Sequence, residues 1–335
     1  KEMLKMRGDI LKKKLMVLCA VAIMISTCLT GCKMNSGKIR FGSAGIGGTY
    51  QIFGDTFANL ISSKSKKYNI EVKTTAGSAA NLRLLSKDYI QMAVAQMDLI
   101  NDAYNRTGIF ENDKKYQGYR AVASLYTEAC QIVVPADSDI QSMDDLEGKK
   151  VCIGEEESGT EQNALQILNA YGLNERLVDT VNLNYTDAAK KLKSGDIDAF
   201  FCTAGVQTTV INELSKQCKI RLVSLDQKGV SRLKKSYKFY TEYTIPAGTY
   251  VNQTKEIKTV GVKAVLLASD KLSDTVKDIT QILFKNQQQI QYALPVDISL
   301  DETTAVDGIT IPFHDGAAAY YKQHGITVNT EKGSN

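Results

Sequence analysis

Two glycine- and hydroxyl-rich loops carry the residue types best suited to binding an anion. The first, Gly42–Thr49, holds four glycines, and the second, Gly154–Thr160, ends in Ser158, Gly159 and Thr160. Each loop follows a strand-like run and precedes a helix-like run, so free backbone N–H groups at the helix start can hold a negative group. The sequence therefore predicts two backbone cradles for a carboxylate. A plain flexible turn is the alternative at the first loop.

Polar residues that follow other predicted strands are candidates for the same site. Gln96 and Asp98 follow a buried strand in the first half of the chain, and Thr203 ends a comparable strand in the second half. Open α/β sheets bind ligands at the carboxyl ends of such strands. Asn81 could point its amide at a ligand, and Ser78 could either touch a ligand or only cap the helix that begins there. We expect these polar ends to converge on one cleft.

The sequence lacks the usual enzyme motifs. Gly48 stands where a P-loop needs lysine, and Tyr50 stands where a dinucleotide-binding loop needs glycine. No Gly-x-Ser-x-Gly or His-Glu-x-x-His motif occurs, and His314 and His324 fit cap and surface positions of a late helix. We therefore predict a binding protein rather than an enzyme, without a cofactor. An exported amide hydrolase with Cys202 as its nucleophile is the less favoured alternative.

Neither the acidic run nor the cysteines indicate a metal site. The acids at Glu155–Glu157 are adjacent, and a solvated loop is the commoner outcome for such a run. Cys130, Cys152 and Cys202 lie in apolar strand-like runs, where thiols behave as small hydrophobic groups. No Cys-x-x-Cys motif occurs, and the chain has two histidines. We predict core packing of these thiols over a disulfide, and no bound metal.

The composition is that of an average soluble protein, with 43% hydrophobic and 23% charged residues among 335. It excludes disordered and multi-span membrane classes, and the length suggests two domains. The formal net charge is +4, but residues 1–31 hold six basic and two acidic residues, so the remainder is neutral. Because a neutral chain offers no electrostatic footprint for nucleic acid, we expect no nucleic-acid partner.

The first 32 residues have the pattern of an export signal. Basic Lys12–Lys14 precedes the apolar run Leu15–Ile25, which is too short to span a membrane. The Leu-Thr-Gly-Cys sequence that ends at Cys32 resembles a bacterial lipobox, whose cysteine is lipidated. We predict a lipoprotein signal peptide over 1–31, a lipid-anchored tether over 32–38, and attachment to the outer face of the cell membrane. Ordinary cleavage and an uncleaved anchor are the alternatives.

Alternating strand and helix signals predict an α/β fold with mainly parallel sheets. An apolar stripe at helical spacing runs from Tyr50 to Ile61, and a second helix is expected over Thr160–Ala170. A faint repeat relates 85–93 to 192–200, each with the pattern of helix, tight turn and buried strand, which suggests two comparable lobes. The predicted strands are Lys38–Ser43, Ile70–Thr74, Met92–Ala95, Lys150–Gly154, Thr180–Asn184 and Ile197–Thr203.

Two segments are expected to connect the lobes. The strand-like stretch Tyr119–Val134 could carry the chain into the second lobe, and a return near Tyr240–Ile245 would bring it back. Two crossing segments make a hinge. The sequence therefore predicts lobe I over 39–125 plus 243–335, and lobe II over 126–242.

A series of short motifs follows the predicted tether in a fixed order. They lie within Phe41–Tyr50, Gly77–Leu85, Ala95–Asp98, Ile245–Tyr250 and Ile311–Ile326. In this order and spacing the chain resembles the TAXI family of solute-binding proteins, the extracytoplasmic receptors of tripartite ATP-independent (TRAP) transporters. The resemblance covers nearly everything after the tether.

The resemblance implies a two-lobed periplasmic-binding-protein type II fold with a two-segment hinge, each lobe a mainly parallel sheet flanked by helices. It implies that the hinge closes on a small organic anion, either a carboxylate or an amino acid like glutamate or glutamine. The partners would be TRAP permease subunits in the membrane, and we expect a monomer. Family-like contacts would fall on Gly48, Thr49, Tyr50, Ser78, Asn81 and Gln96 from one lobe, and on Tyr126, Ser158, Gly159, Thr160 and Thr203 from the other.

Some features depart from the family pattern. Other TRAP receptors hold the ligand carboxylate with an arginine, and Arg83 is the only arginine in the motif loops here. We therefore expect neutral donors and helix N-termini to hold the charge. Asp88 and Tyr89 replace the expected Gly-Glu turn.

Two alternatives to a TRAP receptor remain. A receptor for an ATP-driven importer shares the same fold and cellular address and is the nearer alternative. Ligand presentation to a signalling partner is the other.

Overall fold

The structure is a computed structural model that describes residues 38–113, 116–294, 296 and 300–331. The predicted signal peptide and Cys32 lie outside the described residues. The strands are β1 Lys38–Gly42, β2 Asn69–Lys73, β3 Met92–Gln96, β4 Tyr119–Pro135, β5 Lys150–Gly154, β6 Asp179–Asn182, β7 Ala199–Ala204, β8 Ile220–Leu222, β9 Thr241–Ile245 and β10 Ile257–Ser269. The helices are α2 Thr49–Lys64, α3 Ser78–Ser86, α4 Met97–Asn105, α5 Gly159–Ala170, α6 Tyr185–Ser194, α7 Thr209–Gln217, α8 Gln227–Ser236, α9 Ser273–Lys285, α10 Gln287–Ala293 and α11 Asp315–Gln323.

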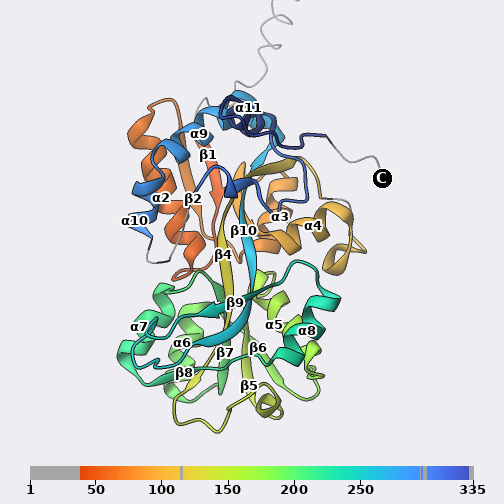
Figure 1. The fold of residues 1–335 in the computed structure, drawn as a ribbon, viewed down its shortest axis with the longest axis vertical. Helices are drawn as coiled ribbons and strands as arrows, with labels where there is room; N and C mark the ends of the chain where they lie inside the picture. Colours follow the sequence, from red (N-terminus) through yellow and green to blue (C-terminus); the bar gives the residue numbers. More distant parts are fainter. Residues whose placement is uncertain (1–37, 114–115, 295, 297–299, 332–335) are drawn as a thin grey trace, which may run out of the picture. The chain divides into compact units, whose positions relative to one another are not determined.

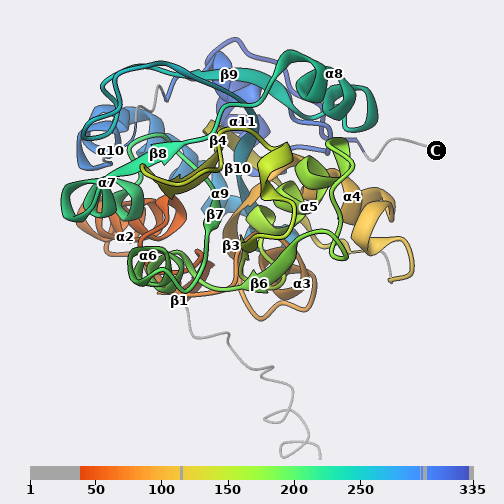
Figure 2. The same cartoon turned by 90° about the horizontal axis from the view of Figure 1, so that it is seen from below.

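The strands of the described residues join one mixed sheet. Its order is β2-β1-β3-β10-β4-β7-β5-β6, with β8 paired to β4 and β9 to β10. The pairs β1–β3, β5–β6 and β5–β7 are parallel, whereas the long strands β4 and β10 run antiparallel to their neighbours. Helices α2 and α10 lie on one side of this sheet and α3 and α4 on the other, and α6 and α7 lie opposite α5 and α8 (Figures 1 and 2).

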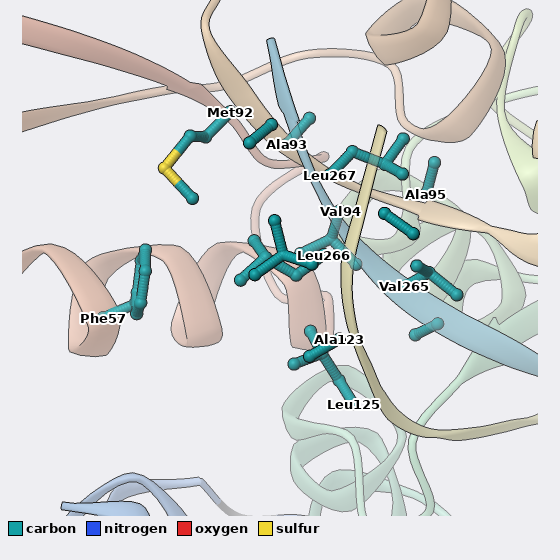
Figure 3. Packing of buried hydrophobic residues seen from close by; sticks show 14 of the residues in the cluster. Phe57, Met92, Ala93, Val94, Ala95, Ala123, Leu125, Val265, Leu266 and Leu267 are labelled. Carbon is teal, nitrogen blue, oxygen red and sulfur yellow. The ribbon is translucent and has the colours of Figure 1, made fainter. Parts of the chain in front are cut away.

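The buried side chains form separate cores toward the two ends of the long strands β4 and β10. One core draws on residues 39–126 and 264–321. The other end holds two clusters, drawn from 129–262. The chain is therefore a two-lobed α/β protein, with lobe I built around the first core and lobe II around the other two. Figure 3 shows part of the lobe I core, where Leu266 of β10 pairs with Val94 of β3 near Phe57 of α2.

The two crossing strands explain how the lobes are joined. Tyr126 belongs to the lobe I core and Cys130 to a lobe II core, so β4 changes lobe between them. In the same way, β10 places Val262 in lobe II and Ala264 in lobe I. The expected return segment, Tyr240–Ile245, holds strand β9, which pairs with β10 before that crossing. We propose that the lobe boundary lies at these two points of β4 and β10.

Local sequence signals match the elements that form. The apolar stripe of α2 is buried, and Phe53 stacks on Phe57 at 5.5 Å between ring centroids. Burial of each such side chain contributes about 1.5–3 kcal/mol. Both turns of the predicted repeat adopt the left-handed backbone conformation, at Asp88 (φ 60°) and Gly195 (φ 77°). The repeat is therefore present in the backbone, as α3–β3 in lobe I and α6–β7 in lobe II. Within the described ranges, no helix has the length and apolar character needed to cross a membrane.

Candidate functional site

A cavity lies between the two lobes and is lined by residues of both. Its lining encloses about 460 Å³ of non-atom space, part of it open to solvent. Nine of the eleven predicted contact residues line it. From lobe I these are Gly48, Thr49, Tyr50, Ser78 and Gln96. From lobe II they are Ser158, Gly159, Thr160 and Thr203.

Helix N-termini surround this cavity. Among the described residues, five N-cap residues line it, those of α2, α3, α4, α5 and α6: Gly48, Gly77, Gln96, Ser158 and Asn184. Free N–H groups and the helix dipole make each such end favourable for a negative charge, by about 0.3–1 kcal/mol where it is exposed and up to about 2 where it is partly buried. None of the lining residues that the structure describes is Lys, Arg or His. The cavity can therefore hold an anionic group through backbone and neutral donors.

The caps on the two sides are built differently. Ser158 caps α5 as expected, since its Oγ accepts a hydrogen bond from the Glu161 amide at 3.0 Å. Ser78 is not the cap of α3, because Gly77 holds that position with φ 120°, a left-handed value that favours glycine. The Ser78 Oγ instead accepts from the Gln96 amide at 3.1 Å. Ser78 thus ties the start of α3 to the end of β3 at the cavity wall.

A buried acid stands in the same cavity. Glu128 of β4 is 2% exposed, and Tyr50 Oη donates a hydrogen bond to its Oε2 at 2.6 Å. Burial, aided by the charge of Asp98, raises the pKa of Glu128 to about 8, although hydrogen bonds from Tyr50 and Gln96 oppose the shift. Burial likewise raises the pKa of Asp98 to about 6. Glu128 therefore carries a proton at neutral pH in this environment.

Several polar atoms around Glu128 are buried without a partner. Gln96 Oε1, Thr49 Oγ1 and Tyr126 Oη make no hydrogen bond within the described residues. Burial and the charge of Glu128 raise the pKa of Tyr126, and the nearby Thr49 hydroxyl opposes the shift. Buried polar groups in proteins are normally paired, so an orphaned set lining or adjoining a cavity indicates a place for a polar ligand or for water.

A hydroxyl network fixes the lobe II wall. Tyr185 Oη donates to the Thr203 carbonyl at 2.9 Å, so in its 2.5 Å contact with Thr160 Oγ1 the threonine is the donor. Thr160 Oγ1 also accepts from the Thr203 amide at 3.2 Å. The Thr160 hydroxyl is thus committed within the protein. Its contribution is to hold β7 against α5 and α6 at the cavity.

Contacts across the cavity rim hold the two lobes together. Asn163 Nδ2 of lobe II donates to Asp98 Oδ2 of lobe I at 3.2 Å. The Arg83 guanidinium forms a 3.0 Å ion pair with Glu157, whose carbonyl also accepts from the Ala80 amide at 3.3 Å. These contacts describe a closed arrangement of the lobes.

Two predicted contact residues do not line the cavity. Asn81 is fully buried, and its Nδ2 donates to the carbonyl oxygens of Gly42, Ser43 and Val94 at 2.7–3.3 Å. Its amide therefore joins β1 to β3 rather than pointing into the site. Tyr126 is packed in the lobe I core, next to Tyr50.

Sequence reasoning missed Glu128, Asn184 and Tyr185. Glu128 is an isolated acid in a long apolar strand, a pattern that marks a buried functional carboxyl. Asn184 precedes Asp187 by three residues and caps α6 through a 2.8 Å bond to the Asp187 amide, which is a recognisable helix start. Nothing in the sequence indicates that Tyr185 faces Thr160 and Thr203, since that contact depends on how β7 packs.

Two expectations concerned cysteine and histidine. The four described cysteines, Cys130, Cys152, Cys202 and Cys218, are free thiols. Burial raises the pKa of Cys202 far above neutrality, so its thiol is not activated for attack. His314 caps α11 by accepting from the Gly316 amide at 3.0 Å, as a cap position predicts.

Comparison with known proteins agrees with this architecture. The chain belongs to the NMT1-like family, whose profile matches residues 41–325. A solved Bordetella bronchiseptica protein is 14% identical, with 87% of this chain and 98% of that chain covered and a TM-score of 0.54. A Pseudomonas aeruginosa protein, a binding component of an ABC phosphonate transporter, is 14% identical over 81% and 84%, with a TM-score of 0.50. A Listeria monocytogenes protein named for an L-cystine ABC transporter is 16% identical over 79% and 98%, also at 0.50. The fold is that of type II periplasmic binding proteins.

Proposed function

We propose that this protein is an extracytoplasmic solute-binding receptor that captures a small organic acid by closing its lobes. The proposal depends on one observation: five helix N-termini, from both lobes, line one cavity between lobes that are joined by the two strands β4 and β10. A ligand that touches both lobes gains contacts in the closed state that the open state lacks, so its binding raises the closed population. Capture needs no reaction, and the buried, unactivated Cys202 gives no support to an amide hydrolase.

The ligand class follows from the lining. Backbone N–H groups and hydroxyls, without a basic side chain in the described lining, suit a carboxylate held by neutral donors. The resemblance to TAXI receptors favours a carboxylate or an amino acid like glutamate or glutamine. The two ABC-transporter proteins of similar fold are named for phosphonate and L-cystine, which are also small and acidic or zwitterionic.

The membrane partner is a permease that recognises the closed form. The named transport proteins of similar fold serve ATP-driven importers, which favours an importer of that type. The motif order favours a TRAP permease instead. Uptake by membrane vesicles that carry the receptor separates the two, because an ion-gradient uncoupler abolishes TRAP uptake and ATP depletion abolishes ABC uptake.

We also propose that Cys32 anchors the receptor to the outer face of the membrane. The support is the lipobox-like sequence and the short polar tether after it. Mass spectrometry of the N-terminal peptide from membranes tests this anchor: a diacylglyceryl group on Cys32 is expected, and an unmodified thiol contradicts it. Sedimentation of the delipidated receptor is expected to give a monomer.

A thermal-shift screen of amino acids, keto acids and dicarboxylates tests the receptor function. A true ligand at 100 times its Kd adds about 2.7 kcal/mol to stability. Small-angle scattering with and without that ligand then tests closure. Binding with an unchanged radius of gyration would contradict the hinge mechanism, and a screen without any stabilising acid would contradict the receptor itself.

A further inference from the structure

The cavity pairs a wall of helix N-termini with the buried acid Glu128, and a second, partly exposed acid, Glu155, also lines it. Glu128 lies on crossing strand β4 opposite Val262 of β10 and lines the cavity with Gln96 and Thr49. No basic side chain in the described lining balances a negative charge on Glu128. A ligand that carried negative groups alone would be repelled by Glu128 whenever that residue ionised, and the repulsion would be strong in a buried site. The ionised form of Glu128 therefore needs a positive counterpart, which the described lining does not supply and a ligand can.

Some buried polar atoms near Glu128 lack a hydrogen-bond partner, and they include the acceptors that a positive group on the ligand requires. The residues Gln96 and Thr49 are each 2% exposed and line the cavity. Their side-chain oxygens, Gln96 Oε1 and Thr49 Oγ1, lack a hydrogen-bond partner in the described residues. An ammonium group offers three N–H donors. The Glu128 carboxylate, the Gln96 carbonyl and the Thr49 hydroxyl are three acceptors in one cavity. A ligand without a hydrogen-bond donor at this point would leave the Gln96 carbonyl to water or unpaired, and an unpaired buried carbonyl costs affinity.

We propose that Glu128 is the residue that selects an ammonium group, so that the receptor takes a zwitterionic amino acid with its acidic group at the helix N-termini and its ammonium group on Glu128. This inference rests on the proposed receptor function and extends it. It assigns a specificity residue, and it excludes the keto acid of the same carbon skeleton as the preferred ligand.

Proton release accompanies this mode of binding. At neutral pH the buried Glu128 is protonated, because its pKa is raised to about 8. A neighbouring ammonium favours the ionised form, so the Glu128 O–H bond breaks, the proton passes to solvent and the ammonium keeps its own three protons. Of the titratable groups around Glu128, Asp98 has a pKa of about 6 and ionises at lower pH. Glu155 lines the same cavity, and partial burial and the charge of Asp187 raise its pKa. The others have pKa values raised well above neutrality and stay uncharged; they are Tyr50, Tyr126, Cys130, Tyr185 and Cys202.

The test uses pairs of probes that differ only at the amino group. Isothermal titration of the full chain compares L-glutamate with 2-oxoglutarate, L-leucine with 4-methyl-2-oxopentanoate, and L-alanine with pyruvate. For wild-type protein we expect one amino acid to bind at least about tenfold more tightly than its keto acid. Glu128→Gln should reduce that preference to within about twofold, whereas the exposed surface variant Glu213→Gln should keep it.

Proton counting gives a second, independent readout. Titration of the same amino acid at pH 7 in phosphate and in Tris should report release of about one proton by wild-type protein and none by Glu128→Gln. Circular dichroism confirms that the variant is folded. Should Glu128→Gln fail to fold, Glu128→Asp, which retains the carboxylate, must keep the amino-acid preference and the proton release.

The outcomes separate the two proposals. A keto acid that binds wild-type protein as tightly as its amino acid leaves the receptor function standing and overturns the role of Glu128. That role is also overturned if Glu128→Gln retains the wild-type preference, or if binding releases no proton. Absence of binding by every probe in the wider acid screen overturns the receptor function, and the Glu128 assignment falls with it.

Discussion

One added methyl group at Gly159 should oppose closure of the lobes. A Cβ at this position would lie 2.2 Å from Gln96 Oε1 and 2.4 Å from Gln96 Cδ, across the boundary between the lobes. Gly159 does not have a left-handed φ, so alanine fits the backbone of α5 itself. The clash arises only when the lobes meet. Gly159→Ala should therefore weaken ligand binding without destabilising the unliganded protein.

The size of the effect follows from how far Gln96 can move. Its amide is the end of a flexible side chain, but Gln96 is 2% exposed and contacts Glu128, so it cannot swing into solvent. Overpacking of this kind costs about 1–3 kcal/mol. That corresponds to a loss of affinity between about fivefold and 150-fold. The midpoint of unliganded thermal unfolding should stay the same or rise slightly, because alanine is a better helix former than glycine.

Titration calorimetry with the acid found by screening measures the loss of affinity. A double-mutant cycle identifies its cause. In a Gln96→Ala background the clash partner is gone, so Gly159→Ala should then cost less than about twofold in affinity. Wild-type affinity in the single variant Gly159→Ala would refute the closed geometry. An equal loss in both backgrounds would refute the assignment of the clash to Gln96.

Three further substitutions have defined outcomes. Asn81→Ala removes hydrogen bonds to three backbone carbonyls. It should lower the free energy of unfolding, measured by urea titration, by about 2–4 kcal/mol and leave the ligand preference unchanged. A loss of unfolding free energy below about 0.5 kcal/mol would contradict the structural role of Asn81. Arg83→Gln breaks the partly exposed ion pair with Glu157 across the lobes, as well as a pair with Asp113 within lobe I. It should weaken ligand binding by no more than about fivefold, with less effect at high salt, and a larger or salt-independent loss would contradict this surface role in closure. For Asp98, the folded-state pKa of about 6 exceeds the unfolded value, so its burial favours folding at low pH and that advantage is lost as pH rises from about 4 to 6. Asp98→Asn should flatten this part of the stability profile, and an unchanged slope in urea titrations at pH 4–6 would contradict the shifted pKa.

Local signals predicted most of the fold. The stripe from Tyr50 to Ile61 predicts α2 because a helix buries positions three and four apart. The glycine loop, Ser158 and the strand ends predict most of the cavity lining, since the position of a loop at the end of a parallel strand follows from the α/β pattern itself. The crossing strand β4 is visible as an unusually long apolar run. Each of these features depends on neighbours within the same segment.

Features that depend on tertiary pairing were not predictable in the same way. The sequence around Tyr240–Ile245 has the strand propensity of a crossing segment, but the structure pairs it along β10 before β10 itself changes lobe. Propensity reports that a strand forms and says nothing of its partner. Asn81 has the residue type of a ligand contact, yet three carbonyls of β1, β3 and the loop after β1 occupy its amide.

The position of Glu128 connects ligand chemistry with the hinge. It lies on β4 between Tyr126, which packs in the lobe I core, and Cys130, which packs in a lobe II core. Tyr50 and Gln96, which contact Glu128, both come from lobe I, while the cavity wall opposite them begins at Ser158 of lobe II. If Glu128 binds the ligand as we propose, the ligand would be attached to the hinge strand and to lobe I before lobe II closes over it. An ammonium group would then fix the ligand in the open receptor, and the helix ends of α5 and α6 would reach its acidic group only as the lobes close.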